Sequence, residues 1–355
     1  MKGIILHGGH GTRLRPLTHT GPKQLLPIAN RPMSEYCLNS LRDAGIIDIA
    51  IIIGGIGSNK VKEYYGDGTN FGVKLSYILQ DYPRGIAHAI RLCKDFVGKE
   101  KFVVFLGDNI IQKNIDEYVD DFTNSNYAAS ILLCEVDNPS QFGIAEIKNE
   151  KIIKLTEKPK NPATNLAVTG IYFLTPLIFN LIDRLEPSWR NELEIVDALQ
   201  MLLDIDEKVN YYMITDFWKD TGTPDDILQA NKTILENMKS YFYGNKEDNI
   251  TIEGNVMIGE NTIIKSGSKI NGPVIIGNNC IISDGAIVDS NTSIGNNTTL
   301  SQCHVKNSII MNDCIINCKI KIKHSIIAPN SKISEQLIKQ DEKIFMLGEG
   351  TNIIL

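Results

Sequence analysis

The sequence predicts an α/β fold in which a Rossmann-like domain with a mostly parallel sheet is followed by a left-handed parallel β-helix. Three observations support this prediction. A chain of 355 residues is too long for one small core and favours two domains. Short apolar runs alternate with amphipathic segments up to about residue 237, and a six-residue repeat begins near residue 250. We therefore expect an α/β domain at 1–237, a polar linker at 238–249, the β-helix at 250–333 and a terminal cap at 334–355.

The elements of the α/β domain follow from the spacing of its apolar residues. Met33–Ala44 has apolar side chains at helical spacing and a following glycine, and Ala87–Cys93 is expected to form another helix. Strands are expected at Gly3–Leu6, Ile49–Ile53, Lys74–Leu79 and Phe102–Leu106. The continuous apolar run at Ile49–Ile53 predicts a strand that is covered on both faces. Because ligands of such sheets bind beyond the carboxyl ends of the strands, we expect the site in the loops after Leu6, Leu79 and Leu106.

One column of large aliphatic residues, spaced six positions apart, dominates the second half. Its members are Ile252, Ile258, Ile264, Ile270, Ile276, Ile282, Val288, Ile294 and Leu300. This period is neither helical nor the alternation of a simple strand, and it is typical of the stacked coils of a parallel β-helix. After Leu300 the frame shifts by four residues and resumes at Ile310, which predicts a small loop in one coil.

Composition and charge exclude several classes of protein. There are 36 Lys and Arg residues against 42 Asp and Glu, so the net charge is −6 and a nucleic-acid or anionic-membrane partner is not expected. The 7 scattered cysteines contain no C-x-x-C pair, which supports neither a disulfide framework nor a zinc site. The chain starts without a signal-peptide layout and has no apolar run of about 18 residues. We expect a cytoplasmic protein that binds small molecules.

A glycine-rich loop follows the first strand and reads GGHGTRLRPLT from Gly8 to Thr18. Glycines allow backbone N–H groups to approach a phosphate closely, and Arg13, Arg15 and Lys23 add positive charge. The loop is not a Walker A motif, because no Gly-Lys-Ser/Thr follows it. Any one glycine could simply form a turn, but the whole string indicates a phosphate site.

This loop and the segment PKQLLPIANRPM at 22–33 resemble the signature of sugar-1-phosphate nucleotidylyltransferases. Further segments resemble the same family: Gln80 with PRGIAHAI at 83–90, LGDN at 106–109, FGIAEI at 142–147, EKP at 157–159, VTGIYFL at 168–174, RNELEIVDA at 190–198 and WKDTGTP at 218–224. The resemblance covers nearly the whole chain. It is strongest to the long, thymidylyl-transferring members that carry a C-terminal β-helix.

The resemblance implies that dTTP and α-D-glucose 1-phosphate react to give dTDP-glucose and pyrophosphate. A phosphate monoester is mostly ionised at neutral pH, so the reaction needs alignment and charge neutralisation and no general base. The implied catalytic cations are Arg13, Lys23, Lys158 and Arg190. Asp108 and Asp220 are the implied ligands of Mg²⁺, although either one alone could cap a helix or a turn.

The resemblance also implies two sets of substrate contacts. The nucleotide set is Leu6, Gly8, Gly9, Gly11, Thr12, Arg13, Gln80, Pro83, Gly85 and Asp108, in which Gln80 and Gly85 read the imide edge of thymine or uracil. The sugar set is Gly107, Gly143, Glu157, Lys158, Val168, Thr169, Gly170, Tyr172 and Arg190. Tyr172 has the alternative of a core aromatic. His7 stands where the family usually has a small residue, and we expect it to pack rather than bind.

Several alternatives stay open at this point. The substrate could be UTP or another sugar 1-phosphate. A catalytically silent regulatory homologue is disfavoured, because the implied cations and carboxylates are all present. An acyl transfer activity in the β-helix would need a histidine base, for which only His304 and His324 are available there. We expect instead that the β-helix mediates self-association, and a homotrimer is favoured.

Overall fold

The computed structural model describes residues 1–9, 11–283 and 285–335. The chain forms two compact units, and its N-terminal part contributes to both of them. The first unit comprises residues 1–11, 20–25 and 33–220. The second comprises residues 12–19, 26–32 and the chain from Thr221 onward. Each unit is described here by itself.

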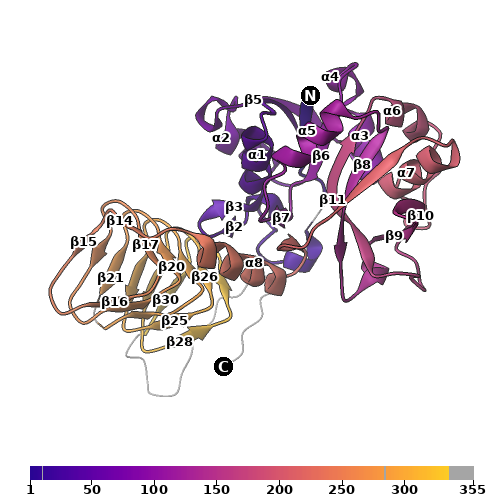
Figure 1. The fold of residues 1–355 in the computed structure, drawn as a ribbon. Helices are drawn as coiled ribbons and strands as arrows, with labels where there is room; N and C mark the ends of the chain where they lie inside the picture. The colour runs from indigo at the N-terminus through magenta and orange to yellow at the C-terminus, as the bar shows by residue number, and fades with distance from the viewer. Residues whose placement is uncertain (10, 284, 336–355) are drawn as a thin grey trace. The chain divides into compact units, whose positions relative to one another are not determined.

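A nine-stranded sheet forms the centre of the first unit (Figure 1). Its parallel half consists of β6 (Phe102–Leu106), β1 (Lys2–Leu6), β4 (Asp48–Ile53) and β5 (Lys74–Leu79), which are hydrogen-bonded in that order. The other half is mixed and contains β11 (Leu166–Leu174), β8 (Ala129–Glu135), β12 (Val209–Met213), β9 (Gly143–Lys148) and β10 (Lys151–Glu157). The Rossmann-like sheet is thus confirmed, and the carboxyl ends of the four parallel strands meet at one edge.

Helices cover both faces of this sheet. Successive side chains of a strand point to opposite faces, so each face has apolar side chains that must be buried. Ile5 belongs to one apolar cluster, whereas Ile4 and Leu6 belong to the other. The cluster of Ile5 is packed by α1 (Met33–Asp43), α2 (Ser58–Tyr65) and α5 (Asp116–Asn124). The opposite cluster is packed by α3 (Ile86–Arg91), α4 (Lys94–Val97), α6 (Leu177–Ile182) and α7 (Ile195–Asp204). The helices expected at Met33–Ala44 and Ala87–Cys93 are confirmed to within two residues at each end.

Three parallel sheets of short strands stack into the β-helix of the second unit (Figure 1). The first contains β14 (Tyr241–Phe242), β17 (Val256–Ile258), β20 (Val274–Ile276), β23 (Thr292–Ile294), β26 (Ile309–Ile310) and β29 (Ile326–Ile327). The second contains β15 (Asn245–Lys246), β18 (Ile263–Ile264), β21 (Ile281–Ser283), β24 (Thr299–Ser301), β27 (Ile315–Asn317) and β30 (Lys332–Ser334). The third contains β16 (Thr251–Glu253), β19 (Lys269–Asn271), β22 (Ile287–Val288), β25 (His304–Lys306) and β28 (Lys321–Lys323). This is the stacking expected of a left-handed β-helix.

The register of these sheets explains the aliphatic column. Ile252 pairs with Ile270, Ile258 with Ile276 and Ile264 with Ile282, so that equivalent side chains stack from coil to coil and fill the interior. The small loop expected after Leu300 is wrong. Val305 pairs with Val288 and Ile310 with Ile294, so the column takes two steps of five residues and then returns to a step of six at Ile316. Two turns are shortened instead.

The helix α8 (Pro224–Asn237) and the hairpin of β2 (Pro27–Ile28) and β3 (Arg31–Pro32) pack on one side of this β-helix. Leu235 and Ala29 form a small apolar cluster with Met257 and Ile275, which project outward from β17 and β20. Asn231 is buried at the same junction. Its Oδ1 accepts hydrogen bonds from the Ala29 N–H (2.8 Å) and from Ser293 Oγ (2.6 Å), and its Nδ2 donates to the Asn291 carbonyl (3.1 Å).

The boundaries of the β-helix differ from those expected. The segment 238–249, expected as a linker, carries β14 and β15, which pair in register with β17 and β18 and so form part of the first coil. The cap expected at 334–355 lies outside the described residues from residue 336 onward. Among the residues that the structure describes, no helix is long and apolar enough to cross a membrane.

Candidate active site

The glycine-rich loop begins where β1 ends at Leu6. Gly9 and Gly11 have φ angles of 97° and 58°, which favour glycine over any residue with a side chain. Gln24 fixes the start of the loop, because its buried Nε2 donates to the Gly8 carbonyl over 3.0 Å. Gln24 Oε1 has no hydrogen-bond partner among the described residues, and the preceding Lys23 begins a short 3-10 turn. The start of the loop is therefore fixed by Gln24, the neighbour of Lys23 in this turn.

Lys23 forms an ion pair with Asp108, which follows the end of β6. Both side chains are mostly buried, with 12% and 14% exposure. Burial acts to raise the pKa of Asp108, but the Lys23 ammonium and a hydrogen bond from Asn109 Nδ2 (3.0 Å) outweigh it, so the pKa lies below its usual value. A cation and an ionised carboxylate are therefore held together beside the loop.

Asp220 is brought to the same place by a two-stranded pairing. The strand β13 (Trp218–Asp220) pairs antiparallel with β7 (Asn109–Ile111), and Asp220 lies opposite Asn109. Asn109 is itself fixed, because its Oδ1 accepts hydrogen bonds from Trp218 Nε1 (2.9 Å) and from the Gly170 N–H (3.2 Å). Asp108 and Asp220 therefore stand at adjoining strand ends, although the sequence separates them widely.

The donor set of these two aspartates suits a hard divalent cation. Two carboxylates leave several coordination positions for phosphate oxygens and water, as Mg²⁺ prefers. Among the described residues, no group of three or more His, Cys, Asp or Glu side chains could hold a metal ion. The residues present thus fit an ion that is shared with a substrate, and they do not form a closed structural site.

The residues predicted to contact the nucleobase lie at and after the end of β5. Gln80 is 5% exposed, and its Nε2 lies 2.9 Å from His88 Nδ1 on α3. Gly85, whose φ is 97°, lies against the Leu193 backbone so closely that a Cβ there would come within 2.4 Å of the Leu193 carbonyl oxygen. Pro83 is half-buried beside it. His88 lies in the same PRGIAHAI motif as Gly85, but no pattern in the sequence marks it as a site residue.

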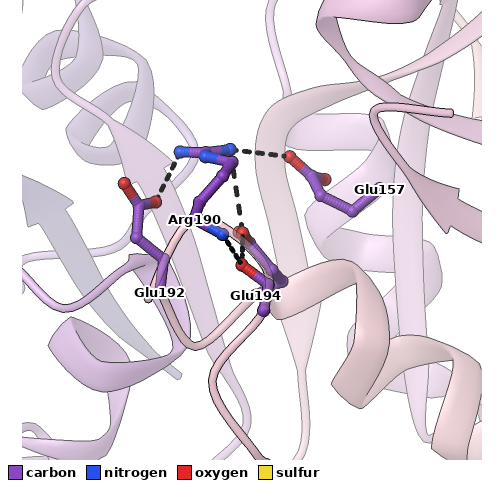
Figure 2. A network of polar contacts seen from close by, with 5 residues as sticks. Glu157, Arg190, Glu192 and Glu194 are labelled. Atoms are coloured by element: carbon purple, nitrogen blue, oxygen red, sulfur yellow. Dashed lines mark hydrogen bonds and ion pairs between the residues drawn. The ribbon is translucent and has the colours of Figure 1, made fainter. Parts of the chain in front are cut away.

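Arg190, one of the predicted sugar contacts, lies at the centre of a polar network (Figure 2). Its guanidinium contacts Glu192 at 2.5 Å, Glu157 at 3.3 Å and Glu194 at 3.7 Å. Glu194 also accepts a hydrogen bond of 2.7 Å from Ser188 Oγ. Three carboxylates surround one guanidinium, and Glu192 and Glu194 are members that the sequence analysis left out, although both stand in the RNELE motif.

Glu157 ends β10 and is mostly buried in this network. Its own burial and the neighbouring Glu194 carboxylate raise its pKa to about 7, although Lys158 and Arg190 act in the opposite direction. The Lys158 N–H donates to the Phe142 carbonyl over 3.0 Å. Gly143 pairs with Glu157, and a Cβ on Gly143 would lie only 2.6 Å from a Val196 methyl group. The glycine there leaves Glu157 close to the backbone of β9.

The remaining sugar-side residues lie on β11, with Gly107 at the end of β6. Val168, Thr169 and Tyr172 are buried, and Thr169 Oγ1 has no hydrogen-bond partner in the described part of the chain. Tyr172 packs in the same apolar cluster as Ile4, and burial raises the pKa of its hydroxyl. A Cβ on Gly170 would come within 2.7 Å of the Leu106 side chain, and one on Gly107 within 2.9 Å of the Leu6 carbonyl oxygen. Tyr172 thus takes the core position that was its alternative.

Two predicted nucleotide contacts belong to the second unit. Thr12 and Arg13 lie in the segment 12–19. The Arg13 guanidinium rests on Gly222, where a Cβ would come within 2.8 Å of it. Gly222 directly precedes Thr223, which caps α8 by a reciprocal hydrogen-bond pair with Asp226.

His7 is buried beside the loop and behaves as expected for a packing residue. Neither of its ring nitrogens has a hydrogen-bond partner among the described residues, and its ring meets that of Tyr65 edge-on at 6.2 Å. Burial lowers the pKa of His7 to about 3, so the ring is neutral at physiological pH. An uncharged ring leaves the positive charge of the site to the lysines and arginines.

The two histidines of the β-helix make local polar contacts. His304 Nε2 lies 2.6 Å from Asp289 Oδ2. His324 lies 2.9 Å from Asp225 Oδ1 on α8 and 2.8 Å from Asn307 Nδ2. Both contacts lie within the second unit, where they join neighbouring segments.

Comparisons with known proteins show what the whole chain is similar to. Residues 2–237 match the family described as nucleotidyl transferase, and residues 270–353 match the GMPPB C-terminal domain. The low-salt glycan biosynthesis nucleotidyltransferase Agl11 of Haloferax volcanii is 41% identical over 358 residues, which cover 100% of both chains. The glucose-1-phosphate thymidylyltransferase of Streptomyces antibioticus is 38% identical over 355 residues and 99% of both chains. A crystal structure of UDP-glucose pyrophosphorylase with UDP-glucose aligns with a TM-score of 0.60 and 25% identity over 67% of this chain and 99% of that one.

Proposed function

Because the chain belongs to the sugar-1-phosphate nucleotidyltransferase family, we propose that it transfers a thymidylyl group from dTTP to α-D-glucose 1-phosphate. The products are dTDP-glucose and pyrophosphate. The observation that supports this most directly is the pairing of β13 with β7, which brings Asp220 beside Asp108 and its partner Lys23. Two carboxylates and a buried cation at the end of a glycine-rich loop suit a triphosphate and its metal ion.

The proposed reaction is an attack by phosphate on phosphate. An oxygen of glucose 1-phosphate forms a bond to the α-phosphorus of dTTP, and the bond from that phosphorus to the β-phosphate oxygen breaks. The bonding electrons leave with pyrophosphate. The attacking phosphate is already ionised, so the residues of the site align two anions and neutralise charge without removing a proton.

On the nucleotide side, the open backbone at Gly8, Gly9 and Gly11 cradles the triphosphate. Lys23 neutralises charge near the α-phosphate, and Arg13 contacts the departing phosphates. Asp108 and Asp220 would hold Mg²⁺, which when bound supplies positive charge shared among the phosphate oxygens. The other nucleotide contacts are Leu6, Thr12, Pro83 and the pair Gln80 and Gly85, which face the base.

On the sugar side, Arg190 and Lys158 contact the phosphate of the incoming sugar, and Glu157 accepts hydrogen bonds from its hydroxyl groups. The backbones at Gly107, Gly143, Val168, Thr169 and Gly170 line the sugar. The Arg190 guanidinium is surrounded by carboxylates, so it is held in place before any substrate arrives (Figure 2). A preorganised cation costs little reorganisation during the reaction.

Pyrophosphate release tests the proposal. The enzyme is incubated with Mg²⁺ and glucose 1-phosphate and with dTTP, UTP, ATP, CTP or GTP in turn. We expect release with dTTP well above the others. Asp108→Asn and Asp220→Asn should abolish turnover, whereas Asp216→Asn, at an exposed position near β13, should not. Full activity of the doubly substituted enzyme would contradict the roles given to the two aspartates.

A uridylyl transfer is the second candidate, and the structural similarity to UDP-glucose pyrophosphorylase favours it. Gln80 and Gly85 can pair with the imide edge that thymine and uracil share, and neither is placed to contact the 5-methyl group selectively. Equal rates with dTTP and UTP would support this broader activity.

We also propose that the β-helix mediates self-association as a homotrimer. Exposed apolar side chains on the β-helix, such as Ile263 and Ile315, are suited to such a contact. Sedimentation equilibrium should then give about three times the 39.5 kDa chain mass.

A further inference from the structure

The Gln80 side chain is fixed between two neighbours on opposite sides. Its Nε2 lies 2.9 Å from His88 Nδ1. Its Oε1 faces the glycine-rich loop, where it would lie 3.5 Å from a Cβ placed on Gly8. The Gln80 backbone is fixed as well, because its N–H donates to the Ile53 carbonyl over 2.8 Å. The amide therefore has one end toward His88 and the other toward the glycine-rich loop.

The direction of the hydrogen bond to His88 follows from the atoms involved. An amide NH₂ group can only donate, so His88 Nδ1 must be the acceptor, and the ring proton must lie on Nε2. Burial and the charges of Arg91 and Arg84 lower the pKa of His88, which keeps the ring neutral and able to accept at neutral pH. A flipped amide would turn Oε1 toward Nδ1 and would lose this bond as long as the ring proton stays on Nε2.

The orientation of the amide matters for the choice of base. Thymine and uracil carry a donor at N3, which Oε1 can accept. Cytosine carries an acceptor at N3, so it would need the NH₂ group of a flipped amide in that place. We infer that His88 is a positioning residue that gives the enzyme its preference for an imide-bearing pyrimidine, because it accepts from Gln80 Nε2 and so holds Gln80 Oε1 toward the base. This inference rests on the proposed function, in which Gln80 reads the base.

The test compares His88→Leu with His88→Asn. Leucine removes the acceptor, whereas Asn Oδ1 is attached to Cγ in the place of His Nδ1 and can accept the same hydrogen bond. For each enzyme we would measure the KM of dTTP and of UTP and the inhibition constant of CTP against dTTP. In His88→Leu, the ratio of the CTP inhibition constant to the dTTP KM should fall by about tenfold, which is the size expected for the loss of one orienting hydrogen bond. His88→Asn should retain most of that ratio.

The ratio of dTTP to UTP provides the internal control, because both bases present the same edge. It should stay within about twofold of the wild-type value in both variants. General damage to the fold would weaken the binding of all nucleotides together and lower the melting temperature. An unchanged CTP to dTTP ratio in His88→Leu, with an active wild-type enzyme and an unchanged melting temperature, would overturn the inference. A wild-type enzyme that releases pyrophosphate from neither dTTP nor UTP would refute the proposed function, and the inference that rests on it.

Discussion

At the scale of single residues, the candidate site contains two cations that are already paired with carboxylates. Lys23 pairs with Asp108, and Arg190 contacts Glu157, Glu192 and Glu194. Paired charges can be buried where single ones cannot, since desolvation of an isolated ion is very unfavourable. A phosphate that binds Arg190 must compete with these carboxylates, so the affinity for the sugar phosphate depends on how firmly they hold the guanidinium.

The raised pKa of Glu157, which lies among the carboxylates around Arg190, should make the stability of the protein depend on pH. Its pKa rises from an ordinary value of 4.5 to about 7 in the folded protein, so between these values the native state keeps a proton that the unfolded chain has lost. The stability from this group is fully present below pH 4.5 and is lost as the pH rises through 7. We expect wild type to lose on the order of 2 kcal/mol relative to Glu157→Gln between pH 5 and pH 8. Urea unfolding at both pH values measures this difference.

An exposed glutamate of the same region provides the control for that experiment. Glu150 lies in the turn between β9 and β10, and Glu150→Gln should leave the change from pH 5 to pH 8 as it is in wild type. A Glu157→Gln protein whose stability changes with pH as steeply as wild type would show that Glu157 is ionised throughout this range.

At the scale of elements, α8 depends on one buried side chain for its attachment to the β-helix. Asn231 satisfies the Ala29 N–H, Ser293 Oγ and the Asn291 carbonyl at once. Asn231→Leu would leave these polar groups buried without their partner, so we expect a loss of about 2–4 kcal/mol in the free energy of unfolding. Thermal and urea unfolding measure it, and Asn237→Ala at the exposed end of the same helix is the matched control.

A second substitution distinguishes lost hydrogen bonds from poor packing at this junction. Adding Ser293→Ala to Asn231→Leu removes one of the polar groups that was left unpaired, so part of the stability should return. If the double variant is less stable than Asn231→Leu by the full cost of Ser293→Ala alone, the hydrogen bond between the two side chains does not contribute.

The individual strands show how much of the fold could be predicted from the sequence. The strands at Ile49–Ile53, Lys74–Leu79 and Phe102–Leu106 and the stacked column of the β-helix could be predicted because each depends on a local period. The shortened turn before Val305 could not be predicted, because the loss of one residue from a turn becomes clear only from the pairing of Val305 with Val288 in the neighbouring coil. The proximity of Asp220 to Asp108 depends on the pairing of β13 with β7, which no local pattern reveals, and only the resemblance to a family indicated it.

The polar neighbours of the site were the hardest part to predict. Asn109 organises three partners through one side chain, and Gln24 fixes the Gly8 carbonyl, yet a single amide in a sequence carries no sign of its contacts. The same holds for His88 and Glu192. In contrast, the glycines at 85, 107, 143 and 170 stand where a Cβ would meet its neighbours within 3 Å, so their place in motifs has a steric cause.

At the scale of the whole molecule, the chain passes repeatedly between its two units near the glycine-rich loop. Segments 12–19 and 26–32 belong to the second unit, and residues 20–25, which include Lys23, belong to the first. Arg13 and Lys23 are therefore carried by segments whose ends are fixed in different units. The stability of the second unit should then influence Arg13 and Lys23, the cations proposed for the triphosphate, even though the sheet of the first unit has its own two apolar clusters.

A chain that ends at Asn237, the last residue of α8, tests this dependence. It would keep the whole sheet of the first unit but lose Met257 and Ile275, which pack on Ala29 and Leu235. It would also lose Ser293 and Asn291, the hydrogen-bond partners of Asn231. Exposing the apolar side chains of this junction to water costs about 25 cal/mol per Å² of free energy, and its buried polar groups lose their hydrogen bonds. We expect a lower melting temperature, binding of an apolar dye and weaker pyrophosphate release than in the full chain. As a control, Leu235→Lys in the shortened chain should reduce the dye binding without restoring activity. A shortened chain that is as stable and active as the full chain would show that the first unit alone organises the glycine-rich loop.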